Sequence, residues 1–127
     1  MVMKTFMMTA KEYTPYVLLD AKNGIIEISG RSFPEDANRF YKPILRWVDE
    51  YISSPNANTQ LNLKFSYFNT ASSKKILELI KKISSIKKTE NKLIINWYYD
   101  EGEDDMLNAG NDFSSVVDVP FKFIEVK

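Results

Sequence analysis

The chain of 127 residues is 44% hydrophobic and 13% aromatic, which is enough to bury one apolar core but not two. Its 17 basic residues balance its 17 acidic residues, which disfavours a nucleic-acid-binding protein, because such proteins usually carry a net basic charge. It contains no cysteine and no histidine, which excludes disulfides, thiolate zinc sites, cysteine nucleophiles and a Ser-His-Asp triad. An enzyme with this composition would have to use carboxylates, lysine, tyrosine or a hard metal ion.

We expect neither a targeting segment nor a membrane-spanning segment in this sequence. Lys4 interrupts the apolar opening, which is too short for a signal peptide, and no later stretch approaches the roughly 20 apolar residues of a membrane span. We expect a single domain over residues 1–127, in a soluble cytoplasmic protein that contacts neither membrane nor nucleic acid.

The first predicted feature is an antiparallel hairpin. Residues 1–14 are expected to form a poorly defined lead-in, either irregular or a short edge strand. Two short apolar runs, Tyr16–Asp20 and Ile25–Ser29, flank Asn23-Gly24, a dipeptide typical of hairpin turns because both residues accept positive φ.

A helix follows this hairpin. Pro34 and the acidic pair Glu35-Asp36 are typical of a first helical turn, and apolar residues then repeat at helical spacing to about Ile52. Pro43 lies inside this pattern and predicts either a kink or two helical pieces. The apolar stripe comprises Phe40, Ile44, Trp47, Val48 and Tyr51.

The next segment, Leu61–Ile83, changes its apolar period from two to between three and four, which predicts a strand running directly into a helix. The turn between them contains neither glycine nor proline, so Asn69 or Thr70 is the natural N-cap. The strand is expected to direct Leu61, Leu63, Phe65 and Tyr67 to one buried face, and the helix to bury Ile76, Leu79, Ile80 and Ile83.

Three further elements complete the predicted order β-β-α-β-α-β-α-β: a strand at Lys92–Tyr99, a short helix at Met106–Phe113 and a strand at Val119–Val126. Strands that alternate with helices predict a mixed, mostly parallel sheet behind the N-terminal hairpin. Polar residues at alternate strand positions indicate that helices cover mainly one face.

Two segments are candidates for function. The first is the hydroxyl-rich turn with Thr70, Ser72, Ser73 and Lys74, where a helix start offers free N–H groups to an anion such as phosphate. We expect the N–H groups of Ser72 and Ser73 to be available in this way, although these residues taken alone favour a plain helix cap at Thr70.

The second segment, Asp100–Asp105, holds five carboxylates in six residues and follows the next strand, so it should lie at the same edge of the sheet. A solvated charge run is favoured over a Mg²⁺ site, because the spacing matches no calcium-binding loop and no phosphate-binding glycine motif accompanies it.

Four segments in order give the chain a family resemblance. They are Thr-Pro-Tyr-Val-Leu-Leu-Asp at 14–20, Gly-Arg-Ser-Phe-Pro-Glu at 30–35 leading into the first predicted helix, Asn-Thr-Ala-Ser at 69–72, and Trp-Tyr-Tyr-Asp at 97–100 with its acidic tail. Together they resemble the SiaC-type regulatory phosphoproteins from about Tyr13 to Glu125. The resemblance implies a domain of the anti-sigma-factor-antagonist (STAS) type and a non-enzymatic switch without cofactor, metal or catalytic residues.

In this family a dedicated kinase phosphorylates the threonine of the Asn-Thr-x-Ser turn, and a phosphatase of the metal-dependent PP2C type reverses the modification. In its best-known branch the unphosphorylated form binds and activates a diguanylate cyclase, which promotes biofilm formation. The acceptor here would be Thr70, and Ala71 replaces a serine that is also found in the family. The expected partner-binding residues are Asn69, Thr70, Ser72, Ser73, Lys74, Asp100, Glu101, Glu103 and Asp104.

Two alternatives remain. One is a small Mg²⁺-dependent enzyme that uses Asp100, Glu103 and Asp104. The other is a constitutive scaffold in which Thr70 only caps a helix.

Overall fold

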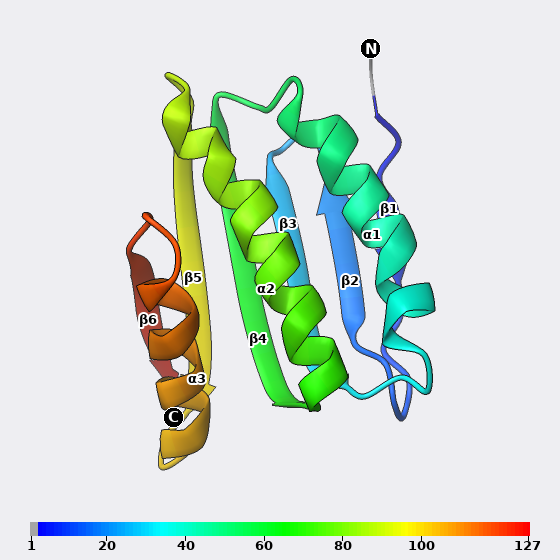
Figure 1. The fold of residues 1–127 in the computed structure, drawn as a ribbon, viewed down its shortest axis with the longest axis vertical. Coiled ribbons are helices and arrows are strands. Elements are labelled where there is room, and N and C mark those ends of the chain that lie inside the picture. The colour runs from blue at the N-terminus through cyan, green and yellow to red at the C-terminus, as the bar shows by residue number, and fades with distance from the viewer. Residues whose placement is uncertain (1–2) are drawn as a thin grey trace.

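The computed structural model describes residues 3–127, and its framework is a six-stranded sheet in the order β1-β2-β3-β4-β5-β6 (Figure 1). Pairing is antiparallel from β1 to β3 and parallel from β3 to β6. This confirms the predicted mixed, mostly parallel sheet with its N-terminal hairpin. The strands are β1 (Phe6–Met8), β2 (Tyr16–Asp20), β3 (Ile25–Ser32), β4 (Asn58–Phe68), β5 (Lys92–Asp100) and β6 (Phe121–Val126).

Strand β1 decides between the two expectations for the lead-in. It is a three-residue edge strand, paired with β2 through Phe6 and Leu19, Met7 and Leu18, and Met8 and Val17. It therefore adds one short strand ahead of the predicted order.

All three α-helices cover the same face of the sheet, as Figure 1 shows. The other face lacks a helix over the described residues, in agreement with the alternating polar residues of the strands. Within residues 3–127 no helix has the length and apolar character that a bilayer crossing requires. The helices are α1 (Ala37–Ile52), α2 (Thr70–Ser84) and α3 (Asp104–Ser115), and a 3-10 helix, η1 (Ser85–Lys88), extends α2.

Helix α1 begins later than the sequence pattern predicts. Asp36 is its N-cap, because the side chain of Asp36 accepts a hydrogen bond from the Arg39 N–H at 3.1 Å. Pro34 and Glu35 therefore precede the helix, and the prediction that they form its first turn is wrong. Pro43 lies inside one continuous helix, so the expected division into two pieces is absent from this segment.

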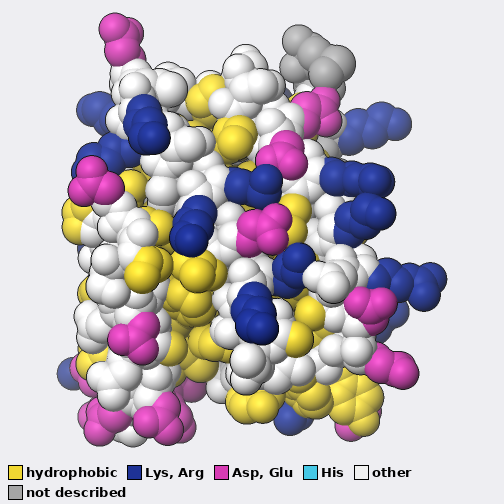
Figure 2. All heavy atoms as spheres, viewed as in Figure 1, with side chains coloured by type: hydrophobic (Ala, Val, Ile, Leu, Met, Phe, Trp, Pro, Cys, Tyr) yellow, Lys and Arg dark blue, Asp and Glu magenta, His cyan; other side chains and the backbone are white. Residues whose placement is uncertain are grey.

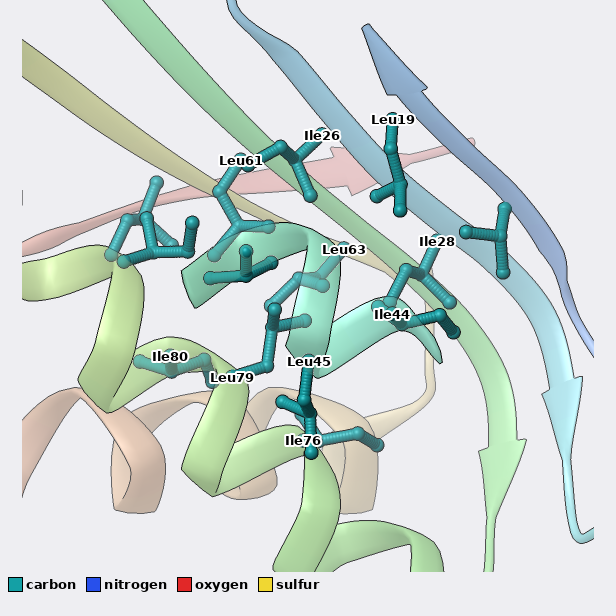
Figure 3. Packing of buried hydrophobic residues seen from close by; sticks show 14 of the residues in the cluster. Leu19, Ile26, Ile28, Ile44, Leu45, Leu61, Leu63, Ile76, Leu79 and Ile80 are labelled. Carbon is teal, nitrogen blue, oxygen red and sulfur yellow. The ribbon is translucent and has the colours of Figure 1, made fainter. Parts of the chain in front are cut away.

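The core lies between the sheet and α1 and α2 (Figure 3). Strands contribute alternate residues and helices contribute a stripe, so both predicted periodicities are present. The buried apolar residues that Figure 3 labels are Leu19, Ile26, Ile28, Ile44, Leu45, Leu61, Leu63, Ile76, Leu79 and Ile80.

The hairpin turn differs from the expected pair of positive-φ residues. Only Gly24 has a positive φ, at 66°, and the turn spans the four residues 21–24. Asn23 instead donates its side-chain amide to the Asp20 carboxylate at 2.7 Å. A Cβ at Gly24 would collide with the Asn58 carbonyl, so both the backbone angle and the available space favour glycine here.

The alternation predicted for β4 fails at its carboxyl end. The register with β3 shifts between Gly30 and Arg31, because Gly30 pairs with Phe65 whereas Arg31 pairs with Tyr67. Ser66 is the extra residue of this bulge, and a bulge exchanges the faces of the residues that follow it. Tyr67 is therefore 48% exposed instead of buried, and Phe68 takes the core side against Trp97.

Candidate functional site

The four parallel strands end at one edge of the sheet, and both candidate segments lie there, as predicted (Figure 1). The turn with Thr70 follows β4, and the acidic loop Asp100–Asp105 follows β5. The end of β3 lies at the same edge and contacts the Thr70 turn. There the backbone N–H of Asn69 donates to the carbonyl of Ser32 at 3.1 Å.

Thr70 is the first residue of α2 and is exposed. Asn69 is the N-cap, since its side chain accepts from the Ser72 N–H at 2.9 Å and its carbonyl accepts from the Ser73 N–H at 2.9 Å. The expectation that Ser72 and Ser73 offer free N–H groups is therefore wrong. Among the described residues, the N–H groups of Thr70 and Ala71 are the ones without a partner at this helix start.

The three hydroxyls of the turn differ in accessibility. Ser72 is 0% exposed, and its hydroxyl accepts from the Ser32 hydroxyl at 2.9 Å, so this side chain cannot touch a partner as expected. The partly exposed Ser73 donates to the Thr70 carbonyl at 2.7 Å. The Thr70 hydroxyl has no hydrogen-bond partner within residues 3–127.

A groove between the amino-terminal halves of α1 and α2 opens beside Thr70. Its charges are balanced, and one of its lysines, Lys75, lies 3.5 Å from Glu78. Lys74 lies one turn after Thr70 on the same helix face, four residues along. The charged lining residues are Glu35, Asp36, Arg39, Lys74, Lys75 and Glu78.

The acidic loop is fully exposed, and Figure 2 shows acidic side chains gathered over the start of α3. Asp104 and Asp105 stand in the first turn of α3, where a negative charge offsets the helix dipole. Glu103 occupies the N-cap position but makes no side-chain capping bond, and the Glu101 N–H donates to the Val126 carbonyl at 2.8 Å.

The acidic loop does not form a metal-ligand set. Within residues 3–127 no three acidic side chains are placed so that they could hold one ion, and this applies to Asp100, Glu103 and Asp104 of the alternative enzyme. The loop is also apart from the turn, because β4 and β5 stop pairing at Leu63 and Trp97 and then diverge. A surface hollow lies between the diverging strands and is lined in part by Lys64, Ser66 and Tyr98.

Sequence reasoning missed an aromatic cluster at this edge, made of Tyr13, Phe33 and Tyr67. The Phe33 ring contacts Tyr13 edge-on at 5.0 Å between centroids and Tyr67 at 5.4 Å, and the guanidinium of Arg31 lies 4.8 Å from the Phe33 centroid. Tyr13 and Tyr67 are about half exposed. Strict strand alternation predicts that Tyr67 is buried. The bulge at Ser66 turns it outward, so the sequence pattern did not reveal this cluster.

It also missed the buried hydroxyls beneath the turn. The hydroxyls of Tyr41, on α1, and Ser32, on β3, are 2.6 Å apart, and Ser32 in turn donates to Ser72. Burial raises the pKa of Tyr41 to about 12, an effect that the hydrogen bonds to Ser32 and Ser72 partly oppose. Tyr41 lies beside the predicted apolar stripe, but nothing in the sequence pairs its hydroxyl with serines 9 and 31 residues away.

Comparisons with known proteins give one consistent result. A family model described as the SiaC family regulatory phosphoprotein matches residues 8–126. A protein of Pseudomonas aeruginosa (strain UCBPP-PA14), described as uncharacterized, is 21% identical over 108 residues, which cover 85% of this chain and 86% of that protein.

Solved structures agree in fold. SiaC of Pseudomonas aeruginosa has a TM-score of 0.87 and 19% identity, covering 98% of this chain and 100% of that one. The crystal structure of diguanylate cyclase SiaD in complex with its activator SiaC, also from Pseudomonas aeruginosa, gives a TM-score of 0.88 at 19% identity, covering 95% and 99%.

Proposed function

The chain belongs to the SiaC family of regulatory phosphoproteins, and from this we propose that it is a non-enzymatic switch that activates a diguanylate cyclase and is released when Thr70 is phosphorylated. A kinase that acts on Thr70, a PP2C-type phosphatase and a cytoplasmic location are parts of the same proposal. The observation that carries it is the accessible hydroxyl of Thr70 at the first position of α2.

Accessibility supports Thr70 as the acceptor. A kinase must reach the acceptor oxygen, and Thr70 is the residue of this turn whose hydroxyl is both exposed and without an internal hydrogen bond among residues 3–127. Ser72 is buried, and Ser73 donates its proton to a backbone carbonyl.

The fold should tolerate the added phosphate. Phosphorylation adds about −1.5 to −2 charges. The unpartnered N–H groups of Thr70 and Ala71, the positive end of the helix dipole and Lys74 are all at hand to accept this charge. The modification therefore needs no large change in the fold.

A partner that covers the turn would not tolerate the phosphate. It would have to bury about two new charges or face them with carboxylates of its own, which costs several kcal/mol unless it supplies cations. The groove beside Thr70 contains as many acidic as basic side chains, so it has no excess positive charge to neutralise the phosphate. Local electrostatics alone would therefore release the partner.

The aromatic cluster of Tyr13, Phe33 and Tyr67 supports a protein partner at this edge. Tyrosine and arginine are enriched among the residues that dominate binding energy, and here they stand next to the Thr70 turn. We place Asn69, Thr70 and Lys74 at the rim of the proposed interface, with the acidic loop as a second contact.

The test compares two purified forms of this protein, unmodified and stoichiometrically phosphorylated on Thr70, with a diguanylate cyclase from the same organism. We expect the unmodified form to bind the cyclase and raise its rate of cyclic di-GMP synthesis, and the phosphorylated form to do neither. Thr70→Ala should bind and activate like the unmodified protein and should resist the kinase. Thr5→Ala, an exposed threonine before β1, is the matched control and should remain switchable.

Equal retention of the cyclase by both forms would contradict the switch and leave a constitutive scaffold, with Thr70 as part of a helix start. Failure of both forms to bind any diguanylate cyclase would contradict the proposed partner. Calorimetric titration with Mg²⁺ checks the enzyme alternative, which micromolar binding lost in Asp104→Asn would favour.

A further inference from the structure

We propose that Ser32, Tyr41 and Ser72 form a positioning network, a chain of buried hydroxyls that holds the turn around Thr70 in the conformation that the kinase and the partner recognise. This inference rests on the proposed function, in which Thr70 is the acceptor. None of the three side chains would touch a ligand, since all are 0% exposed. They act by fixing the backbone beneath Thr70.

The network joins the three elements that surround the turn. Tyr41 comes from α1, Ser32 from the last position of β3 and Ser72 from the first turn of α2. Because Ser32 donates to Ser72 at 2.9 Å, Tyr41 must donate to Ser32 across the 2.6 Å contact, which gives the chain one direction. No buried side-chain nitrogen or oxygen within residues 3–127 lacks a hydrogen-bond partner.

Ser32 holds the turn at two places at once. Its backbone carbonyl accepts from the Asn69 N–H at 3.1 Å, and its hydroxyl donates to Ser72. Asn69 in turn caps the Ser72 N–H. Asn69 and Ser72 are thus hydrogen-bonded to β3 on either side of Thr70 and Ala71. These bonds hold the backbone of the two exposed residues in one conformation.

The same network selects the acceptor. The Ser72 hydroxyl is enclosed and already paired, and the Ser73 hydroxyl donates to the Thr70 carbonyl, so a kinase that reaches this turn meets Thr70 as its exposed and unpaired hydroxyl within residues 3–127. Loss of the network should therefore loosen the turn without exposing a better acceptor, and it should slow phosphorylation of Thr70.

Tyr41→Phe is the direct test, because it removes one hydroxyl and keeps the ring. A matched control exists on the same helix: Tyr51 is also buried, and its hydroxyl lies 2.6 Å from that of Thr59. Tyr51 stands near the carboxyl end of α1, away from the Thr70 turn. The Tyr51 hydroxyl also accepts from the Asn56 N–H at 3.1 Å, so Tyr51→Phe should destabilise the fold at least as much as Tyr41→Phe and is a stringent control.

The first measurement is hydrogen exchange of the Ser72 and Ser73 amides, which donate to Asn69. We expect Tyr41→Phe to speed their exchange about three- to tenfold, and Tyr51→Phe to leave it unchanged. Ser72→Ala, which breaks the chain at its other end, should act like Tyr41→Phe and provides a second test if one variant folds poorly. Equal exchange in both tyrosine variants would overturn the proposal.

The second measurement is the initial rate of phosphate transfer to Thr70 in a lysate of the native cells. Tyr41→Phe should be phosphorylated several-fold more slowly than the wild type, and Tyr51→Phe at the wild-type rate. Wild-type protein that is never phosphorylated, together with faster exchange in Tyr41→Phe, would overturn the proposed function but support the positioning of the turn. Unchanged phosphorylation of Tyr41→Phe beside faster exchange would overturn the role of the network in recognition.

Discussion

At the scale of single residues, burial separates hydroxyls that look alike in the sequence. Thr70 and Ser72 are two residues apart in one turn, yet one is exposed and the other lies in a chain that ends at Tyr41. A helix makes this separation, since residues two apart point in different directions. In the proposed switch, the exposed hydroxyl of Thr70 would accept the phosphate, and the buried hydroxyl of Ser72 would position the turn.

Tyr41 makes a measurable contribution to the dependence of stability on pH. Its pKa is about 12 in the folded protein, because burial disfavours the phenolate, and near 10 in the unfolded chain. Between about pH 10 and pH 12 the folded state retains a proton that the unfolded state loses, so stability falls as pH rises through this range. The loss should approach about 3 kcal/mol above pH 12.

Chemical denaturation at a series of pH values checks this dependence. The difference between the wild type and Tyr41→Phe isolates the contribution of this one phenol. The wild type should lose its advantage over Tyr41→Phe as the pH rises from 10 to 12, so the two stability curves should converge and then cross. A constant separation would show that the phenol ionises with a normal pKa in the folded protein.

At the scale of elements, the close packing of α3 on the sheet centres on one large side chain, Trp97. Trp97, at 0% exposed on β5, donates its indole N–H to the Met106 carbonyl at 2.9 Å and packs against Phe113. The helix can approach this ring because Gly110 faces it without a side chain. Since the acidic loop leads directly into α3, this packing also fixes the position of the loop.

Gly110→Ala should therefore destabilise the protein, although alanine is the better helix former. An added Cβ would lie 2.5 Å from Trp97, which is closer than packed atoms approach and involves a rigid buried ring. Overpacking costs about 1–3 kcal/mol, against a gain of up to about 1 kcal/mol in helix propensity, so we expect a net loss of about 1–2 kcal/mol in the free energy of unfolding. Urea denaturation measures this loss.

Asn111→Ala is the control, because Asn111 is the exposed next residue of α3 and its replacement should change stability by less than about 0.5 kcal/mol. Equal stability of the Gly110→Ala and Asn111→Ala variants would show that α3 can move away from Trp97 at no cost.

At the scale of the whole molecule, a net charge of zero conceals a local asymmetry. The acidic loop lies at the carboxyl edge of the sheet, as does the proposed interface. Lysines lie instead on the outer surface of the helices that cover the sheet (Figure 2). A cluster of one sign attracts a partner of opposite sign over distances of about 10 Å at ordinary ionic strength. We therefore expect the loop to speed encounter with a basic surface of the cyclase.

The variant Asp100→Asn/Glu101→Gln tests this steering and spares Asp104 and Asp105, which stabilise the start of α3. Its association rate with the cyclase should fall several-fold at low salt and match the wild type at about 0.5 M salt, with little change in the dissociation rate. Stopped-flow kinetics at several salt concentrations gives both rates. The double variant Glu90→Gln/Asp118→Asn removes two exposed charges at the opposite edge and should leave the association rate unaltered.

The sequence by itself predicted the order of the elements apart from β1 and η1. Period-two and helical patterns located β2 at its exact bounds, the buried faces of α1 and α2, and a helix start at Asn69 or Thr70, because these features depend on neighbours only a few residues apart. Alternation of strands and helices was enough to place the Thr70 turn and the acidic loop at one edge, since parallel strands end together.

At the edge that carries the Thr70 turn, only the tertiary structure decided that Tyr67 faces solvent and that Ser72 is buried. The bulge at Ser66 turns Tyr67 outward, and a bulge depends on pairing with β3, which the sequence of β4 does not encode locally. The burial of Ser72 depends on Ser32 and Tyr41, which lie 40 and 31 residues away in the chain. A surface and a hydroxyl network are both built from segments distant in sequence, so only their packing in three dimensions reveals them.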